Sequence, residues 1–410
     1  MAAFGETLKE LTAELRRQRT RAVLSLLALA WGTLAVLLLL AFSIGFEDLF
    51  QERTRGMGDG VAVAWPRRTT RPWRGFAVGR AIRITRDDGL LLAAAVPGLA
   101  AVSPEFTIWE RVRAGDRVLR VQLSGVEPCF GGLRMLEPQA GSRFFTPVDV
   151  ADKRRVIFLG DGLAAQLFPA VDPVGRTLVL RGAPFTVIGV LQPKLQDSDY
   201  GSLDKDRAFV PATTFQALFG ARYVDYLVFR ARDTGRQAEC SAAVVAALGA
   251  RLGFDPTDRG ALSVWDTTEQ QRMLSWIFLG FHVILGISGA FTLLVGGVGV
   301  ANLMFLLVRR RTPEFGLKLA VGARPAQIRR EVLGQTLLLV GAGGALGALV
   351  AVAVVAVVAA TPVVEQTGAP AIPPLLATVT ALMLGGVGVL AGWFPARAAS
   401  RLDPVVALRT

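Results

Sequence analysis

Few side chains in this sequence could carry out catalysis. The one histidine, His282, lies in a run without charged residues, so no His-dependent triad or His-containing metal cluster can form in residues 47–272. A neutral histidine hydrogen-bonded between helices is favoured there over an intramembrane functional group. The acidic pairs Asp87-Asp88 and Asp197/Asp199 lie in turn-like contexts, which favour solvated loops over catalytic carboxylates. No Gly-Lys dipeptide occurs, which excludes a GxxxxGK[ST] phosphate loop, and we predict that the chain itself is not an enzyme.

The two cysteines, Cys129 and Cys240, both fall in residues 47–272. In an oxidising compartment a disulfide bond between them is allowed. Two free, partly buried thiols fit the sequence equally well, so both alternatives stay open.

The overall composition narrows the class of protein. Of the 410 residues, 52% are hydrophobic and 19% are charged, the mean hydropathy is +0.45 and the net charge is +12. This hydrophobicity excludes a disordered chain, and soluble domains usually carry about 25% charged residues. The composition is therefore typical of a membrane protein or a nucleic-acid binder, and the placement of the charges decides between them.

Four long segments contain no Asp, Glu, Lys or Arg: 22–46, 273–308, 332–364 and 366–396. A bilayer-spanning helix needs about 20 apolar residues, and core helices of soluble proteins usually keep a polar stripe. We predict transmembrane helices over 22–46, 273–308, 332–362 and 372–396, with an outward turn over 363–371. The first segment exceeds the apolar core of about 7–15 residues in a signal peptide, so we interpret it as a retained span.

Basic residues mark one side of this membrane. Segments 1–21, 309–331 and 397–410 together carry 15 basic and 6 acidic residues, whereas the turn after the third span holds only Glu365. The positive-inside rule then predicts that both termini are cytoplasmic and that residues 47–272 face outward. Because the basicity reflects topology, nucleic acid is excluded as a partner.

Within 1–21, apolar residues recur at helical spacing, which predicts an amphipathic helix on the inner membrane surface, with a plain cytosolic stub as the alternative.

Residues 47–272 have the pattern of a folded α+β domain, in which short β-rich runs alternate with turn signals. The pattern predicts helices over 161–168 and 237–252, an exposed Arg-, Pro- and Gly-rich loop over 66–79, and strands over 61–65, 117–123, 155–159, 177–180, 185–190 and 226–230. The expected fold is a membrane protein of four transmembrane α-helices with a large α+β extracytoplasmic domain inserted between helices 1 and 2.

The loop 309–331 has the most specific pattern, RRRTPEFGLKLAVGARPAQIRRE. Pro313 can start a short helix, Glu314 is favourable near its N-terminus, and Gly322 allows a sharp break before a second helix. Apolar surface is expected from Phe315, Leu317, Leu319 and Val321. Such a helix, held by two spans, could dock into a groove of a partner protein. Its basic residues could equally bind anionic lipid, and the residues alone favour neither.

This loop resembles the hallmark of permease subunits in the MacB/FtsX/LolCE superfamily of ABC transporters, where a Glu-x-Gly-x-(Arg/Lys)-x-Ala-x-Gly-Ala pattern recurs. The matching residues are Glu314, Gly316, Lys318, Ala320, Gly322 and Ala323. The C-terminal segment resembles the family's signature at Pro395, Ala396, Arg397, Asp403, Pro404, Leu408 and Arg409. Stretches 141–145, 167–168, 172–176 and 185–190 look like the MacB-type periplasmic core, so the resemblance covers nearly the whole chain in family order.

The resemblance implies partners and a mechanism. Such permeases pair with themselves or with a paralogous permease, and each pair sits on cytosolic ABC ATPase subunits. The segment from Glu314 to Ala323, including Phe315, would be the coupling helix. The ATPase domain fused in MacB is missing from this sequence, so the motor is expected on a separate chain. That partner would hold ATP and Mg²⁺, and no cofactor is expected in this chain.

The second span is long enough to transmit motion. Its 36 uncharged residues would reach about 54 Å as one helix, against a hydrocarbon core of about 30 Å. The surplus is expected to tilt or to project as a stalk beneath the outward domain. The resemblance then implies efflux or extraction of a substrate across the cell envelope, with a periplasmic adaptor as a further partner.

Two alternatives share these motifs. One is an FtsX-like signalling subunit that controls a cell-wall hydrolase, although FtsX-type outward domains are usually smaller. The other is a LolCE-like permease that releases lipoproteins.

Overall fold

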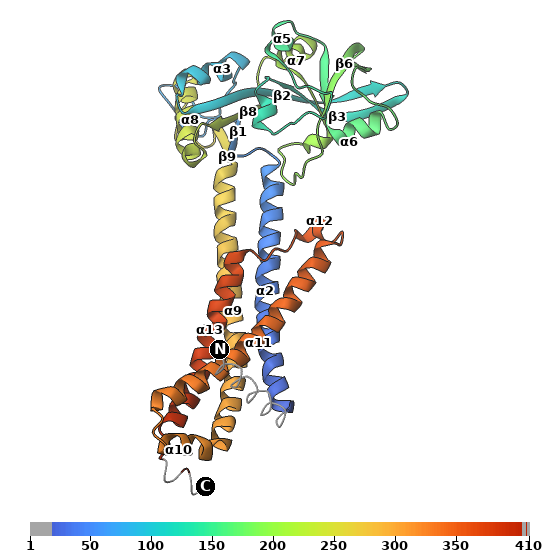
Figure 1. Cartoon of the computed structure of the whole chain (residues 1–410). Coiled ribbons are helices and arrows are strands. Elements are labelled where there is room, and N and C mark those ends of the chain that lie inside the picture. The colour runs from blue at the N-terminus through green and yellow to red at the C-terminus, as the bar shows by residue number, and fades with distance from the viewer. Residues whose placement is uncertain (1–18, 404–406, 408–410) are drawn as a thin grey trace. The chain divides into compact units, whose positions relative to one another are not determined.

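The computed structural model describes residues 19–403 and residue 407, and the chain divides into two compact units (Figure 1). The helical unit comprises residues 1–49 and 276–410, and the α+β unit is Phe50–Ser275. The amphipathic helix predicted over residues 1–21 lies outside the described residues, except that residues 19–21 belong to the first turn of α2.

Among the described residues, four helices are long and apolar enough to cross a bilayer, as predicted. They are α2 (Arg19–Arg55), α9 (Thr267–Arg310), α11 (Pro325–Ala359) and α13 (Pro374–Ser400). Each helix is longer than the predicted span, because backbone hydrogen bonding continues through the polar residues that flank a span. The longest, α9, has 44 residues and would extend about 66 Å.

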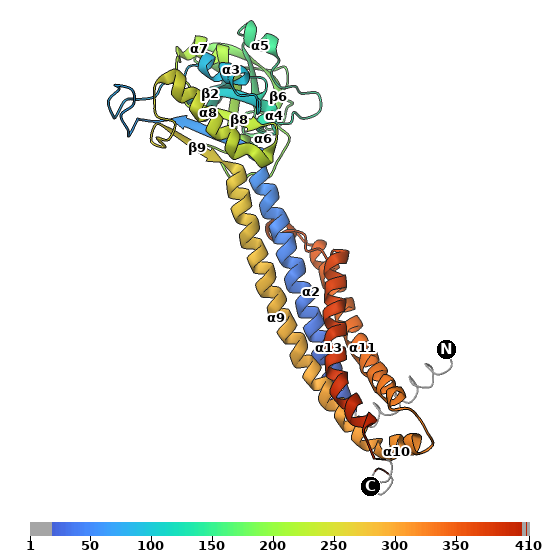
Figure 2. The same cartoon turned by 90° about the vertical axis from the view of Figure 1, so that its left-hand side faces the viewer.

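Spans of the helical unit approach one another closely at glycines. Helices α11 and α13 pack along each other, and a Cβ atom built on Gly392 would lie 2.9–3.1 Å from the side-chain atoms of Thr336. Helices α2 and α9 lie side by side in both views (Figures 1 and 2), and a Cβ atom on Gly289 would lie 2.6 Å from Val36. Small residues at these points let the helix backbones approach each other.

The α+β unit is built on strands in the order β3-β7-β4-β6-β5-β2-β8-β1-β9, with a further pairing of β3 with β2. Because β2 pairs with both β3 and β5, the strands β2, β3, β7, β4, β6 and β5 close into a ring. The first half of β2 instead pairs with β8 and extends the sheet through β1 to β9. The strand bounds are β1 (Val61–Pro66), β2 (Leu99–Ala114), β3 (Arg117–Val126), β4 (Val156–Leu159), β5 (Thr177–Leu180), β6 (Ala183–Val190), β7 (Arg207–Pro211), β8 (Tyr226–Ala231) and β9 (Leu262–Asp266).

Short helices cover these strands. Helix α3 (Arg86–Ala95) contacts β2, and α8 (Gln237–Leu252) contacts β8 and β9. Around the ring lie α4 (Phe130–Leu133), α5 (Pro147–Ala151), α6 (Asp161–Leu167) and α7 (Ala212–Phe219), while α10 (Thr312–Ala320) and α12 (Val364–Thr367) belong to the helical unit. The predicted hairpin is present as β5 and β6, joined through Arg181 and Gly182, both at positive φ. The predicted helix 237–252 is α8.

Candidate coupling site

The loop between α9 and α11 folds as the short helix α10 followed by a tight turn. Pro313 occupies the first turn of α10, where its missing N–H is harmless. Gly322 has φ +101°, a backbone conformation that favours glycine, and it ends the helix. Helix α11 then starts with Pro325, and the side chain of Gln327 accepts a hydrogen bond of 2.9 Å from the backbone N–H of Arg324.

Four charged side chains fasten α10 to the start of α11. The buried Arg311 donates to both carboxylate oxygens of Glu314, at 2.8 and 2.6 Å. Lys318 Nζ lies 3.0 Å from Oε1 of Glu331 and 3.4 Å from Oε1 of Glu314. The hydrogen bond from Arg311 lowers the pKa of Glu314, and the positive charges of Arg311 and Lys318 lower it further. Because both carboxylates face cations, the cluster holds α10 in one orientation.

Beneath this cluster, Phe315 and Gly316 face inward. The Phe315 ring is 1% exposed and lies below the cations of Arg311 and Lys318, 5.3 and 5.8 Å from its centroid. A Cβ atom built on Gly316 would lie 2.5 Å from Cβ of Ala407. The structure thus brings the loop motif into contact with the C-terminal segment, two motifs about 90 residues apart in the sequence.

The opposite face of α10 is exposed and apolar. Leu317 is 55% exposed and Val321 is 82% exposed, and Ala320 and Gly322 beside them are exposed as well. Exposed arginines flank this face in the sequence: Arg309, Arg310, Arg324, Arg329 and Arg330. Of the four residues expected to supply apolar surface, Leu317 and Val321 are exposed, Leu319 is half-buried and Phe315 packs inward. We call Leu317, Ala320, Val321 and Gly322 the exposed face of α10.

The C-terminal signature residues are only partly described. Pro395 and Ala396 are buried within α13, whereas Arg397 and Asp403 are exposed. Ala407, in the same segment, is buried against Gly316. Pro404, Leu408 and Arg409 lie outside the described residues. Ala323 of the loop motif is half-buried beside the turn.

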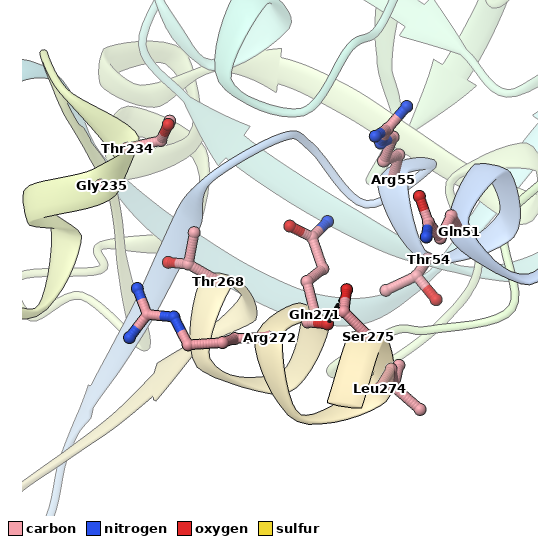
Figure 3. Close-up of a pocket in the computed structure, with 10 residues that line it drawn as sticks. All are labelled: Gln51, Thr54, Arg55, Thr234, Gly235, Thr268, Gln271, Arg272, Leu274 and Ser275. Carbon is pink, nitrogen blue, oxygen red and sulfur yellow. Dashed lines mark hydrogen bonds between the residues drawn. The ribbon is translucent and has the colours of Figure 1, made fainter. Parts of the chain in front are cut away.

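A polar pocket of about 270 Å³ lies in the α+β unit (Figure 3). It is bounded by the end of α2, the start of α9 and the loop before α8, and the side chain of Gln271 lies in its middle. Ser275 donates a hydrogen bond of 3.1 Å to the backbone carbonyl of Gln271. The guanidinium groups of Arg55 and Arg272 point away from each other, so they form no shared anion clamp (Figure 3). No motif in the sequence predicted this pocket.

A buried network of charges joins the ring strands. Arg207 on β7 donates to Glu105 on β2 and to Ser124 on β3, and all three side chains are fully buried. Asp204 accepts hydrogen bonds of 2.8 Å from both Arg134 and Lys194. The network joins strands that are far apart in the sequence, so its role is to stabilise the fold. Among residues 19–403, no cluster of three or more His, Cys, Asp or Glu is arranged to hold a metal ion.

The histidine and the two cysteines considered in the sequence analysis lie outside α10. His282 Nδ1 lies 3.8 Å from a carboxylate oxygen of Glu47, between α9 and α2. Cys129 and Cys240 are both free thiols, the first exposed and the second buried, so of the two alternatives the structure has the unbridged one. The exposed Cys129 thiol still donates a hydrogen bond of 3.3 Å to the Val102 carbonyl.

Four helices that are long and apolar enough to span a bilayer, together with a large α+β unit, define the class as a multi-pass membrane protein. Two family models match the chain: the MacB-like periplasmic core domain over residues 22–247 and the FtsX-like permease C-terminal over residues 286–404. The chain therefore belongs to the MacB-type family of ABC transporter permeases, multi-pass proteins of the inner membrane.

The curated proteins similar to this chain are longer than it is. The macrolide export ATP-binding/permease protein MacB of Rhodospirillum rubrum is 33% identical over 99% of this chain and 60% of its own length. The pyoverdine export ATP-binding/permease protein PvdT of Pseudomonas putida is 31% identical over 98% of this chain and 60% of its own length. The chain thus spans about 60% of the curated relatives that it matches. A similar solved structure is the periplasmic region of MacB from Actinobacillus actinomycetemcomitans, with 15% identity, 55% of this chain and 96% of that chain covered, and a TM-score of 0.44.

Proposed function

We propose that this chain is the permease component of an ABC transporter, which couples ATP hydrolysis by a partner ATPase to movement of its α+β unit. The movement would drive efflux or extraction of a substrate across the cell envelope. One observation carries the proposal: α10 exposes Leu317 and Val321 on one face while its other face is fixed by charges and by Phe315.

The exposed face of α10 has the composition of a docking surface. Exposed apolar side chains on a short helix, flanked by arginines, suit a groove on a partner protein. Because Glu314 and Lys318 hold α10 against its neighbours, a push on this face moves the ends of α9 and α11 with it. The single helix α9 runs without a break from Thr267 to Arg310 and would carry that displacement along its length.

The chemistry of hydrolysis belongs to the partner in this proposal. ATP and Mg²⁺ would be held by the ATPase, and the residues of this chain bind and transmit. By the positive-inside rule, the basic loop and C-terminal segment would lie in the cytoplasm, so both termini would be cytoplasmic and residues 47–272 would face outward. A second permease copy or a paralogue would complete the transporter, with a periplasmic adaptor as a further partner.

The relatives' names suggest the class of substrate. Export of macrolides and of pyoverdine is stated for proteins about 30% identical to this one. We infer that the substrate here is likewise a secreted small molecule or an envelope component.

The test co-expresses the full chain with each ABC ATPase of its genome and measures co-purification and ATP turnover. The variant Leu317→Glu/Val321→Glu places two charges on the exposed face of α10, and we expect ATPase binding to fall at least about tenfold because desolvating two carboxylates opposes docking. The matched control is Val118→Glu/Val171→Glu, which changes two exposed valines of the α+β unit. Unchanged ATPase binding by the first variant, or equal loss in the control, contradicts the proposal.

A further inference from the structure

The Arg-rich stretch after β1, which the proposed function does not use, folds as an ordered β-hairpin over residues 67–80. Thr69 and Arg80 pair through a backbone hydrogen bond of 2.9 Å, and Trp73 and Phe76 pair through two, of 3.1 and 2.8 Å. Arg74 and Gly75 at the tip have φ of 44° and 87°, and positive φ at both central residues is the mark of a type I′ turn. In Figure 2 this segment, in blue, stands away from the rest of its domain at the left. We call residues 67–80 the arginine hairpin.

Buried acceptors anchor the base of the arginine hairpin. Asp258 is 2% exposed and accepts hydrogen bonds from the backbone N–H groups of Thr70 and Arg71, at 2.7 and 3.0 Å. Burial would raise the pKa of Asp258, but the hydrogen bonds from Thr70, Arg71 and Gly260 lower it, so the anchor stays charged. Arg80 donates to the carbonyl oxygens of Leu252 and Gly253, at 2.9 and 2.5 Å. Because the hairpin is already fixed, binding through its tip would require little further ordering.

The tip combines exposed apolar side chains with exposed cations. Phe76 is 49% exposed and Val78 is 55% exposed, with Trp73 half-buried beside them. Residues 61–86 contain no Asp or Glu but seven arginines. Among the described residues, Arg67 and Arg74 make no ion pair, and both are exposed. The hairpin is therefore a convex, positively charged element with an aromatic tip.

We propose that the arginine hairpin docks on an anionic bilayer surface, with Phe76, Val78 and Trp73 entering the interfacial region and Arg67 and Arg74 contacting lipid phosphates. Aromatic side chains favour the boundary between headgroups and acyl chains, and each arginine near an anionic surface adds attraction. The charge complementarity selects anionic over zwitterionic lipid. Because the hairpin protrudes, its shape suits shallow insertion into a bilayer better than it suits packing against a flat protein surface.

The test reconstitutes the full chain in nanodiscs of phosphatidylcholine and measures co-flotation with liposomes. One set of liposomes is pure phosphatidylcholine and the other contains about one third phosphatidylglycerol. We expect flotation only with the anionic liposomes, and about tenfold weaker binding for Arg67→Gln/Arg74→Gln. Trp73→Ala/Phe76→Ala is expected to bind more weakly at every salt concentration, because it removes apolar contact rather than charge.

Control variants and competitors distinguish bilayer binding by the arginine hairpin from the alternative ligands. Arg113→Gln/Arg120→Gln removes the same charge from exposed positions on β2 and β3, and it should float like the unchanged chain. Equal loss in this control, or no flotation with anionic liposomes, overturns the proposal. Complete competition by inorganic phosphate would assign a phosphate site instead of a bilayer surface. Tight binding of a Glu-rich peptide that Arg67→Gln/Arg74→Gln abolishes, with liposome binding unchanged, would assign an acidic protein surface and likewise overturn it.

Discussion

Lys318 on α10 and Glu331 on α11 form a bidentate ion pair, with Nζ 3.0 and 3.1 Å from the two carboxylate oxygens. Thirteen residues separate them in the sequence, and the turn at Gly322 brings them together. This pair joins the helix proposed to meet the ATPase to the third span. In the proposed mechanism, this pair would carry a displacement of α10 to that span.

Breaking this pair should weaken coupling more than stability. Lys318→Glu places a second carboxylate beside that of Glu331 and should reduce ATPase stimulation, while the partly exposed pair contributes only about 1 kcal/mol to folding. The charge exchange Lys318→Glu/Glu331→Lys should restore part of the stimulation, because it rebuilds the attraction in the opposite sense. The measurement is ATP turnover of the reconstituted complex with and without each variant. If the double exchange is no better than Lys318→Glu alone, the pair is not the coupling contact.

Gly316 should be intolerant of any side chain. A methyl group there would lie 2.5 Å from Cβ of Ala407, so Gly316→Ala should displace the C-terminal segment from α10. Limited proteolysis of the full chain should then cleave the C-terminal segment faster. The second substitution Ala407→Gly should restore protection, because it removes the atom that clashes. Gly334→Ala, at a position with open space around its Cβ, is the matched control and should leave the cleavage rate unchanged.

The four spans could be predicted from sequence because membrane insertion depends on hydrophobicity summed over about 20 neighbouring residues. The β5–β6 hairpin could be predicted because the turn residues Arg181 and Gly182 act locally. The inward position of Phe315 could not, since it depends on a buried cluster that Phe315 shares with Ile328 and Val332 of α11 and with residues of other spans.

The ring of strands was also beyond prediction. It closes because one strand, β2, pairs with β8 over its first half and with β3 and β5 over its second. The ion pair of Arg207 with Glu105 bridges 102 residues, and no spacing rule connects them. Long-range pairings of this kind leave no periodic trace in the sequence, whereas the spans and the hairpin do.

A third prediction concerns packing between the third and fourth spans. Gly392→Ala would bring a Cβ atom within 2.9–3.1 Å of the Thr336 side chain and should separate α11 from α13. The expected result is a lower thermal unfolding temperature of the purified full chain. Gly386→Ala on the same helix meets no atom within 4 Å and serves as the control, because alanine in an open helical position is neutral or favourable. Equal effects of the two variants would contradict the packing role of Gly392.

The buried charges predict an acid-sensitive α+β unit. Burial would raise the pKa of Asp204, but the charges of Arg134, Lys194 and Arg207 lower it to about 2, from an ordinary value of 3.8. A carboxyl group with a lowered pKa stabilises the folded state above its unfolded pKa, and this contribution is lost as the pH falls from about 4 to about 2. The contribution is about 2 kcal/mol.

Asp204→Asn should therefore lower the unfolding temperature at neutral pH and flatten its dependence on pH between about 4 and 2. The measurement is a series of thermal melts of the full chain across this range. Asp116→Asn, in the exposed turn between β2 and β3, is the control and should keep the slope of the unchanged chain. An unaltered slope in Asp204→Asn would show that other groups govern the acid transition.

The two free thiols predict slow alkylation. Cys129 is exposed as a residue, but its sulfur lies against the Val102 carbonyl; desolvation of the thiol, together with the negative charge of Glu127, raises its pKa to about 11. Because the thiolate is the reactive form, Cys129 should react at pH 8 about a hundredfold more slowly than an ordinary thiol, and the rate should rise about tenfold per pH unit. Cys240 is buried and should react only after denaturation. Maleimide labelling followed by mass spectrometry measures both rates, with Cys129→Ser and Cys240→Ser identifying each site. A disulfide-linked peptide containing both residues under non-reducing digestion would contradict the free thiols.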